Sequence, residues 1–156
     1  MAKTVQPSWD YSWIVPGKLI QGGYPEPPPS ALSVCDTLVL TAEEAQPRIA
    51  TPPKKLVLRL PLDDDFYRPL PREVGTMAIQ LATQLAKEIC AGRVVAVTCW
   101  QGVNRSGLIT GLTLMQLYGC TGRQAVNIVR AKRKPTATDN TPLSNPMFEQ
   151  FLTALR

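Results

Sequence analysis

The sequence of 156 residues has the length of one average domain, and its 44% hydrophobic and 19% charged residues are typical of a globular protein. It contains no histidine, which excludes Ser-His-Asp and Cys-His catalysis and most zinc and iron sites. The net charge of +5 suits an anionic substrate, and no apolar run of about 18 residues is present, so a membrane partner is not expected.

The first half of the chain predicts short strands separated by proline and glycine. We expect one domain over residues 1–156, with the segment 1–30 packed on it, where Pro25 and the prolines at 27–29 exclude regular structure. Strands are predicted at residues 18–21, 37–40 and 55–60. Thr41 is expected to cap a short helical turn, and Pro61 is expected to end the third strand.

The second half predicts helices around one buried strand. Residues 72–91 carry apolar side chains at intervals of three and four, which predicts a surface helix that Gly92 ends. Residues 94–98 are nearly all apolar, which favours a central strand. Further helices are predicted from Arg105, over 122–133 after the cap Thr121, and over 145–155 after Ser144 or Asn145. This alternation indicates a single α/β domain with a central, mostly parallel sheet of about four to five strands flanked by helices.

The four cysteines show no metal-ligand spacing, so neither a metal nor a cofactor is expected. The N-terminal residues include no apolar signal segment. We therefore expect reduced thiols and a cytoplasmic protein.

The segment between the predicted central strand and the helix that follows combines a thiol, glycines and an arginine. From the thiol onward it reads Cys99, Trp100, Gln101, Gly102, Val103, Asn104, Arg105, Ser106 and Gly107. A loop that ends at a helix N-terminus points free backbone N–H groups at one spot, and glycines let it curl tightly. Arg105 suits bidentate contact with two phosphate oxygens, and such a ring favours the thiolate form of Cys99. The loop therefore predicts a nucleophile inside an oxyanion-binding cradle.

This pattern is specific. The spacing Cys-x5-Arg alone would arise by chance with odds of roughly one in four at this composition. The glycine three residues after the cysteine and the hydroxyl residue after the arginine lower those odds to about two in a thousand.

Cys99-x5-Arg105-Ser106 resembles the signature loop of the protein tyrosine phosphatase superfamily, and residues 102–107 resemble its dual-specificity branch. Residues 13–19, 60–64 and 143–152 resemble, in turn, the opening strand, the acid loop and the closing helix of that family. The resemblance implies a phosphatase that hydrolyses phosphotyrosine and phosphoserine or phosphothreonine in proteins through a phosphocysteine intermediate.

The resemblance also implies a role for each residue of the loop. Cys99 is the nucleophile, and Ser106 stabilises the departing thiolate in the second step. Asn104 is expected to brace the loop rather than to react. The phosphate-binding residues are Trp100, Gln101, Gly102, Val103, Asn104 and Arg105.

The general acid is expected among three adjacent aspartates. Matching the segment 60–62 to the family's strand end places Asp64 at the acid position, with Asp65 second and Asp63 third. The alternative is that these residues only solvate a loop or cap a helix.

Two residues depart from or modify the family pattern. Thr98 stands where the family usually has a histidine that supports the loop by hydrogen bonding, so a weaker or differently pH-tuned enzyme is one outcome. Trp100 is bulky for the mouth of the pocket and is expected to shape access or to stack on an aromatic group.

Other functions remain open at this point. An RNA 5′-triphosphatase would suit the net charge, but by resemblance such enzymes need no loop aspartate. A phosphoinositide phosphatase is disfavoured because residues 100–104 contain no lysine. The basic cluster 130–134 lies at the end of a predicted helix, where cations are favoured anyway, so a nucleic-acid partner is not expected.

Two further alternatives concern the thiol. Because Thr98 stands where the family usually has a histidine, a phosphate-binding pseudophosphatase remains an alternative function. Arsenate or disulfide reduction, or oxidative protection of Cys99, would need a second thiol such as Cys90 or Cys35.

Overall fold

The computed structural model describes residues 9–25, 31–48, 55–136 and 138–155. The strands are β1 (Tyr11–Val15), β2 (Leu19–Gly22), β3 (Thr37–Ala42), β4 (Leu56–Leu62) and β5 (Val95–Thr98). The helices are α1 (Arg72–Cys90), α2 (Arg105–Tyr118), α3 (Gly122–Lys132) and α4 (Pro146–Ala154), with short 3-10 helices η1 (Ala31–Ser33) and η2 (Glu43–Arg48). The prolines at 27–29 lie outside the described residues.

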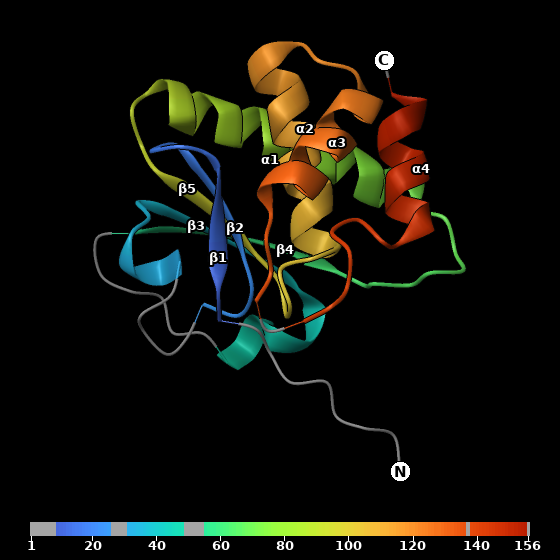
Figure 1. Ribbon diagram of the computed structural model, residues 1–156, viewed down its shortest axis with the longest axis horizontal. Helices are drawn as coiled ribbons and strands as arrows, with labels where there is room; N and C mark the ends of the chain where they lie inside the picture. The colour runs from blue at the N-terminus through green and yellow to red at the C-terminus, as the bar shows by residue number, and fades with distance from the viewer. Residues whose placement is uncertain (1–8, 26–30, 49–54, 137, 156) are drawn as a thin grey trace.

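The strands form one five-stranded sheet in the order β1-β2-β5-β3-β4. β2, β5, β3 and β4 run parallel, and only β1 pairs antiparallel, with β2. The four α-helices lie on one side of this sheet (Figure 1), while η1 packs against its other face through Ala31. The prediction of an α/β fold with a mostly parallel sheet is confirmed. The carboxyl ends of the parallel strands meet at one edge, which is where ligands bind in open α/β sheets.

β5 is the central strand, and all four of its residues are buried. Its side chains alternate between two apolar clusters, with Val97 facing the helices and Ala96 facing η1. A strand covered on both faces favours apolar residues at successive positions, and for that reason the nearly all-apolar run predicted it. The prediction of a buried strand over 94–98 is confirmed to within one residue.

Two predictions at the carboxyl edge of the sheet are wrong. Thr41 lies inside β3 and donates its hydroxyl to the backbone carbonyl of Thr98 (2.7 Å) instead of capping η2. Pro61 does not end β4, which continues to Leu62. β4 is an edge strand, and a proline there costs no hydrogen bond to a further strand.

β1 lies in the N-terminal segment where the pattern of residues predicts no strand before 18. Its outer edge has no strand neighbour in the sheet, and Trp13 is 37% exposed. The resemblance of residues 13–19 to an opening strand does fall on this hairpin.

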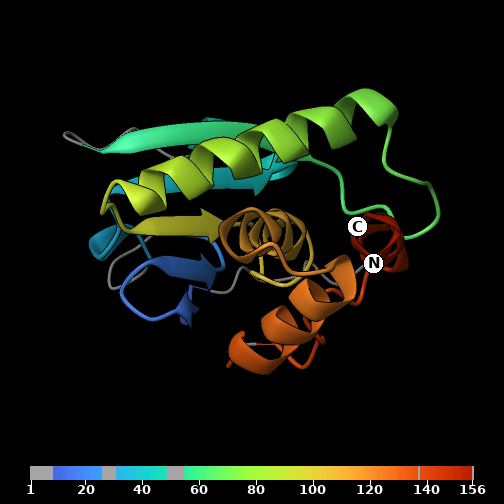
Figure 2. The ribbon, with the colours of Figure 1, turned by 90° about the horizontal axis from the view of Figure 1, so that it is seen from above.

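The helices follow their apolar patterns. In α1 the residues Ala78, Leu85 and Ile89 are buried, and Gly92 follows the helix with a φ of +89°. Figure 2 shows α1 lying beside α2, whose first ten residues are all buried. Thr121 caps α3 in a capping box, and Asn145 rather than Ser144 caps α4. Within the described ranges, no helix is both long and apolar enough to cross a bilayer.

Candidate active site

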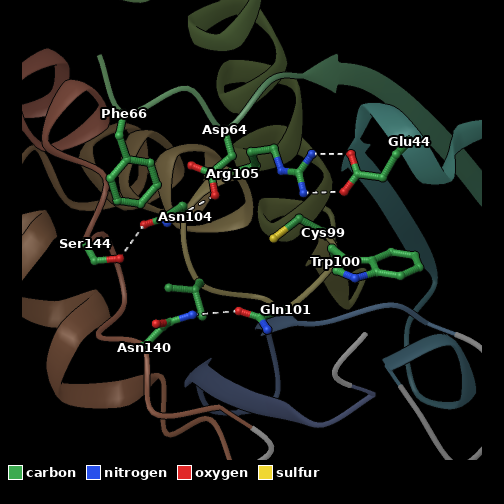
Figure 3. Close-up of a pocket in the computed structure, with 11 residues that line it drawn as sticks. Glu44, Asp64, Phe66, Cys99, Trp100, Gln101, Asn104, Arg105, Asn140 and Ser144 are labelled. Atoms are coloured by element: carbon green, nitrogen blue, oxygen red, sulfur yellow. Dashed lines mark hydrogen bonds and ion pairs between the residues drawn. The ribbon is translucent and has the colours of Figure 1, made fainter. Parts of the chain in front are cut away.

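The predicted site residues gather at the carboxyl edge of the sheet. Cys99 directly follows β5, and Arg105 is the first residue of α2. Between them the loop forms the floor of a cavity of about 510 Å³ (Figure 3). Of the predicted residues, those that line this cavity are Cys99, Trp100, Gln101, Val103, Asn104, Arg105 and Asp64. Gly102 and Ser106 are buried behind the lining.

Gly102 lets the loop pass very close to β2. Its φ is +71°, in the left-handed region that favours glycine. A Cβ atom at this position would lie 2.4 Å from the carbonyl carbon of Gly22. No other residue type fits both the dihedral angle and the space. The tight turn predicted from the glycine therefore has a definite cause in the packing of the loop on the neighbouring strand.

The thiol of Cys99 lies at the bottom of the cavity and is only 5% exposed. Its Sγ lies 3.2 Å from Oγ of Ser106, within hydrogen-bonding distance for sulfur. Ser106 is fully buried in the first turn of α2. The hydroxyl is therefore aimed at the sulfur from the helix N-terminus, where the helix dipole also favours negative charge.

Arg105 is held by a carboxylate that the sequence patterns did not single out. Its Nη1 and Nη2 donate to Oε2 and Oε1 of Glu44 over 2.5 and 2.6 Å, and Nη1 also lies 3.2 Å from the carbonyl of Leu62. Burial by itself lowers the pKa of Arg105, but the hydrogen bonds to Glu44 and the charges around the site outweigh it and raise the pKa above its ordinary value. The guanidinium is thus charged and only 8% exposed. Its buried Nε–H has no hydrogen-bond partner in the described structure.

Asp64 is the only member of the aspartate triplet that lines the cavity. Its Oδ2 accepts from Nδ2 of Asn104 (3.2 Å), and its Oδ1 accepts from Nδ2 of Asn145 (2.7 Å). Asp65 instead accepts from the backbone N–H groups that follow it in the loop. Asp63 lines a separate cavity of about 330 Å³. Of the three aspartates, Asp64 is therefore the one that shares the cavity with Cys99, and its role as the acid stays a prediction.

Asn104 connects the loop to α4. Its Oδ1 accepts from the backbone N–H of Asn145 (2.9 Å) and lies 3.4 Å from Oγ of Ser144. The side chain of Asn145 is fully buried, caps α4 at Met147 and contacts Asp64. Asn104 therefore links the loop between β5 and α2 to Asp64 and to the start of α4.

Thr98 contacts the neighbouring strand of the sheet, whereas Trp100 contacts a nearby aromatic ring. The hydroxyl of Thr98 donates to the carbonyl of Val39 (2.7 Å) in the adjacent strand β3, so it is directed across the sheet. The ring of Trp100 packs edge-on against Tyr24, with centroids 5.2 Å apart, at one wall of the cavity.

The other thiols lie far from Cys99 in the folded structure. Cys90 and Cys35 precede the parallel strands β5 and β3, so both lie at the amino edge of the sheet, whereas Cys99 follows the carboxyl end of β5. A four-residue strand spans about 13 Å. Cys120 follows α2, whose first residue is the one at the site. This arrangement argues against a second thiol that resolves or protects Cys99.

The sequence patterns missed Glu44, Phe66, Asn140 and Ser144 in the lining of the cavity, since Ser144 was predicted only as a helix cap. Glu44 carried one usable signal, an acidic residue just beyond the carboxyl end of a buried parallel strand. Asn140 reaches the site because Gln101 accepts from its Nδ2 over 2.9 Å across the connection between α3 and α4. No local sequence pattern predicts a contact between residues so distant in the sequence.

Comparison with solved structures shows which known proteins share this fold. The chain is similar to human DUSP28 (TM-score 0.66, 17% identity, 98% of each chain covered). It is also similar to DUSP15 (TM-score 0.70, 20% identity, covering 94% of this chain and 86% of that one). A third similar structure is the human tyrosine phosphatase-like serine/threonine/tyrosine-interacting protein (TM-score 0.69, 18% identity, covering 94% and 95%). No protein-family model and no curated protein sequence matches the chain. The chain therefore has the fold of the dual-specificity and related cysteine-based phosphatases.

Proposed function

We propose that this chain is a cysteine-dependent phosphatase that hydrolyses phosphomonoesters in proteins through a phosphocysteine intermediate. The observation that carries the proposal is the cavity in which a thiol and a buried, charged guanidinium share one loop. Within the described ranges the Nε–H of Arg105 is buried without a partner, although unsatisfied buried donors are rare and cost free energy. A phosphate oxygen in the cavity would satisfy it.

In the first step the thiolate of Cys99 attacks phosphorus, so a P–S bond forms while the ester P–O bond breaks. Arg105 and the backbone N–H groups of the loop bind the equatorial oxygens as their charge redistributes. Asp64 donates a proton to the departing oxygen. The carboxyl group is held in place for this by the amides of Asn104 and Asn145.

In the second step water attacks the phosphocysteine, and Asp64 accepts the proton that the water loses. The P–S bond breaks and inorganic phosphate forms. The hydroxyl of Ser106, 3.2 Å from the sulfur, donates a hydrogen bond to the departing thiolate.

The charges around the cavity favour a single phosphate group on a protein over a polyanion. Arg105 is the only cation that lines the cavity in the described structure, beside the carboxylates of Glu44 and Asp64. In the basic cluster 130–134, Arg130 pairs with Glu149, and the buried Arg133 pairs with Asp10. That cluster does not offer a continuous free surface to RNA, which supports a phosphoprotein substrate over triphosphate-ended RNA.

The test is phosphate release from an aryl phosphate, phosphotyrosine and phosphothreonine peptides and triphosphate-ended RNA. We expect release from the aryl phosphate and the peptides, and none from the Cys99→Ser variant. Release from RNA alone would replace the proposed substrate. Binding of phosphate without release from any ester would favour a pseudophosphatase.

The role of Asp64 is tested by comparing leaving groups. Asp64→Asn should lower kcat on phosphothreonine peptide by roughly a hundredfold and leave an activated aryl phosphate within a few fold, because only the poor leaving group needs a proton. Asp63→Asn is the matched control, since that side chain lines the other cavity. An equal loss on both substrates would contradict the assignment.

A further inference from the structure

The carbonyl of Gly102 is held from two directions behind the loop. Nε2 of Gln21 in β2 donates to it over 3.1 Å, and Nε of Arg133 donates to it over 2.8 Å. Arg133 also donates from Nη2 to the carbonyl of Gln101 over 3.1 Å. Two consecutive carbonyls of the loop are thus fixed by side chains from β2 and from the end of α3.

Arg133 is a charged residue buried in the interior, and its side chain is 0% exposed. Besides the two loop carbonyls, it contacts both carboxylate oxygens of Asp10 (3.2 and 3.3 Å) and the hydroxyl of Ser12 (3.2 Å). These contacts match the five N–H donors of a guanidinium. A buried charge is tolerated when it is paired and fully hydrogen-bonded in this way. Its position is therefore strongly determined.

Gln21 is also fully buried, but only one of its two side-chain polar atoms has a hydrogen-bond partner among the described residues. Its Nε2 contacts the loop, whereas its Oε1 has no hydrogen-bond partner among the residues that the structure describes. An orphan buried acceptor costs stability. The hydroxyl of Thr98 contacts Val39 rather than the loop. Of these two strand side chains, Gln21 rather than Thr98 contacts the loop.

We propose that Gln21 and Arg133 are positioning residues that aim the backbone N–H groups of the loop at the phosphate, an inference that rests on the proposed function. In a planar trans peptide the C=O and the following N–H point in opposite directions. Holding the carbonyls of Gln101 and Gly102 behind the loop turns the N–H groups of Gly102 and Val103 toward the cavity side. Neither Gln21 nor Arg133 lines the cavity, so both act through the loop.

Gln21→Met separates this role from a purely structural one. Methionine has nearly the same shape but removes the unsatisfied Oε1 together with the contact to Gly102. We expect an unchanged or higher Tm, and inorganic phosphate bound about five- to tenfold more weakly in calorimetry, from the loss of one hydrogen bond. An unchanged phosphate affinity in this variant would overturn the inference.

Arg133→Lys keeps the charge and removes the planar fork. We expect binding of inorganic phosphate to weaken by about tenfold or more. Arg130→Lys, one turn earlier on α3, is the matched control, because Arg130 contacts Glu149 and the carbonyls of residues 142 and 143. Equal phosphate affinities in the two variants would contradict the inference. Should Arg133→Lys fail to fold, Gln21→Met still decides it.

The two proposals fail in different ways. A wild-type chain that binds inorganic phosphate but releases none from esters would count only against the proposed function. The binding series would then still decide the positioning role. An active wild type whose Gln21→Met variant binds phosphate equally well would count only against the positioning role.

Discussion

Arg105 is charged although it is almost completely buried, and the side chain that makes this tolerable is Glu44. The pair forms two charge-assisted hydrogen bonds in the fork geometry that guanidinium and carboxylate share. Glu44 contacts both Nη atoms, and Nε has no hydrogen-bond partner among the described residues. Glu44 is thus best understood as a support for Arg105.

Glu44→Gln should lower kcat/KM on an aryl phosphate by about tenfold or more, because Arg105 loses a hydrogen-bonded counter-charge. Steady-state kinetics provide the measurement. Glu43→Gln is the control, since the neighbouring glutamate is exposed and lines the other cavity. A gain in kcat/KM would mean that Glu44 competes with phosphate for the guanidinium.

At the scale of elements, the site is a junction between β5, α2 and the neighbouring strands. The strand ends place the thiol, the helix start places the arginine, and the loop between them touches β2 at Gly102. The loop after β4 is connected to the start of α4 by the hydrogen bond between Asn145 and Asp64. The geometry of the cavity therefore depends on how separate elements pack. A substitution in the loop should affect phosphate binding more than it affects the sheet.

Gly102→Ala should abolish phosphate binding and lower the free energy of unfolding by several kcal/mol, since strain at positive φ adds to a Cβ clash with β2. Binding calorimetry and urea unfolding would measure both effects. Gly119→Ala is the matched control, because its φ is +63° and nothing lies within 4 Å of its added Cβ. That variant should lose only about 1 kcal/mol. Similar behaviour of the two variants would show that the approach to β2 is unimportant.

At the scale of the whole molecule, the sheet separates two thiol environments. Cys99 lies at the carboxyl edge in the cavity, while Cys35 is packed in the apolar cluster on the η1 face. Desolvation raises the pKa of Cys35 from 9.0 to about 11. The folded state therefore holds this proton more tightly than the unfolded chain does.

Stability should consequently fall as pH rises between about 9 and 11, because the unfolded chain releases the Cys35 proton first. The free energy of unfolding, measured in urea at pH 8 and pH 10, should drop by about 1 kcal/mol more in the wild type than in Cys35→Ala. Cys90→Ala, which removes an exposed thiol, should behave like the wild type. Identical pH slopes in the wild type and Cys35→Ala would contradict this account.

Local patterns were sufficient for much of the fold. The apolar spacing of α1, the nearly all-apolar run of β5 and the capping box at Thr121 each have a physical cause within a few residues of sequence. The loop from Cys99 to Ser106 was predicted in the same way, because the residues that give it its chemistry are close together in the sequence. The sequence alone therefore determined the α/β class and the predicted nucleophile and phosphate-binding arginine.

Only the tertiary structure decided which distant side chains complete the site. Glu44 on Arg105, Asn145 on Asp64, and Gln21 with Arg133 on Gly102 each join residues more than thirty positions apart or on different elements. Such contacts depend on strand order and helix packing, which no local periodicity encodes. The errors at Thr41 and Pro61 have the same origin. Thr41 forms a hydrogen bond to a neighbouring strand, and Pro61 is accommodated because β4 lies at the edge of the sheet.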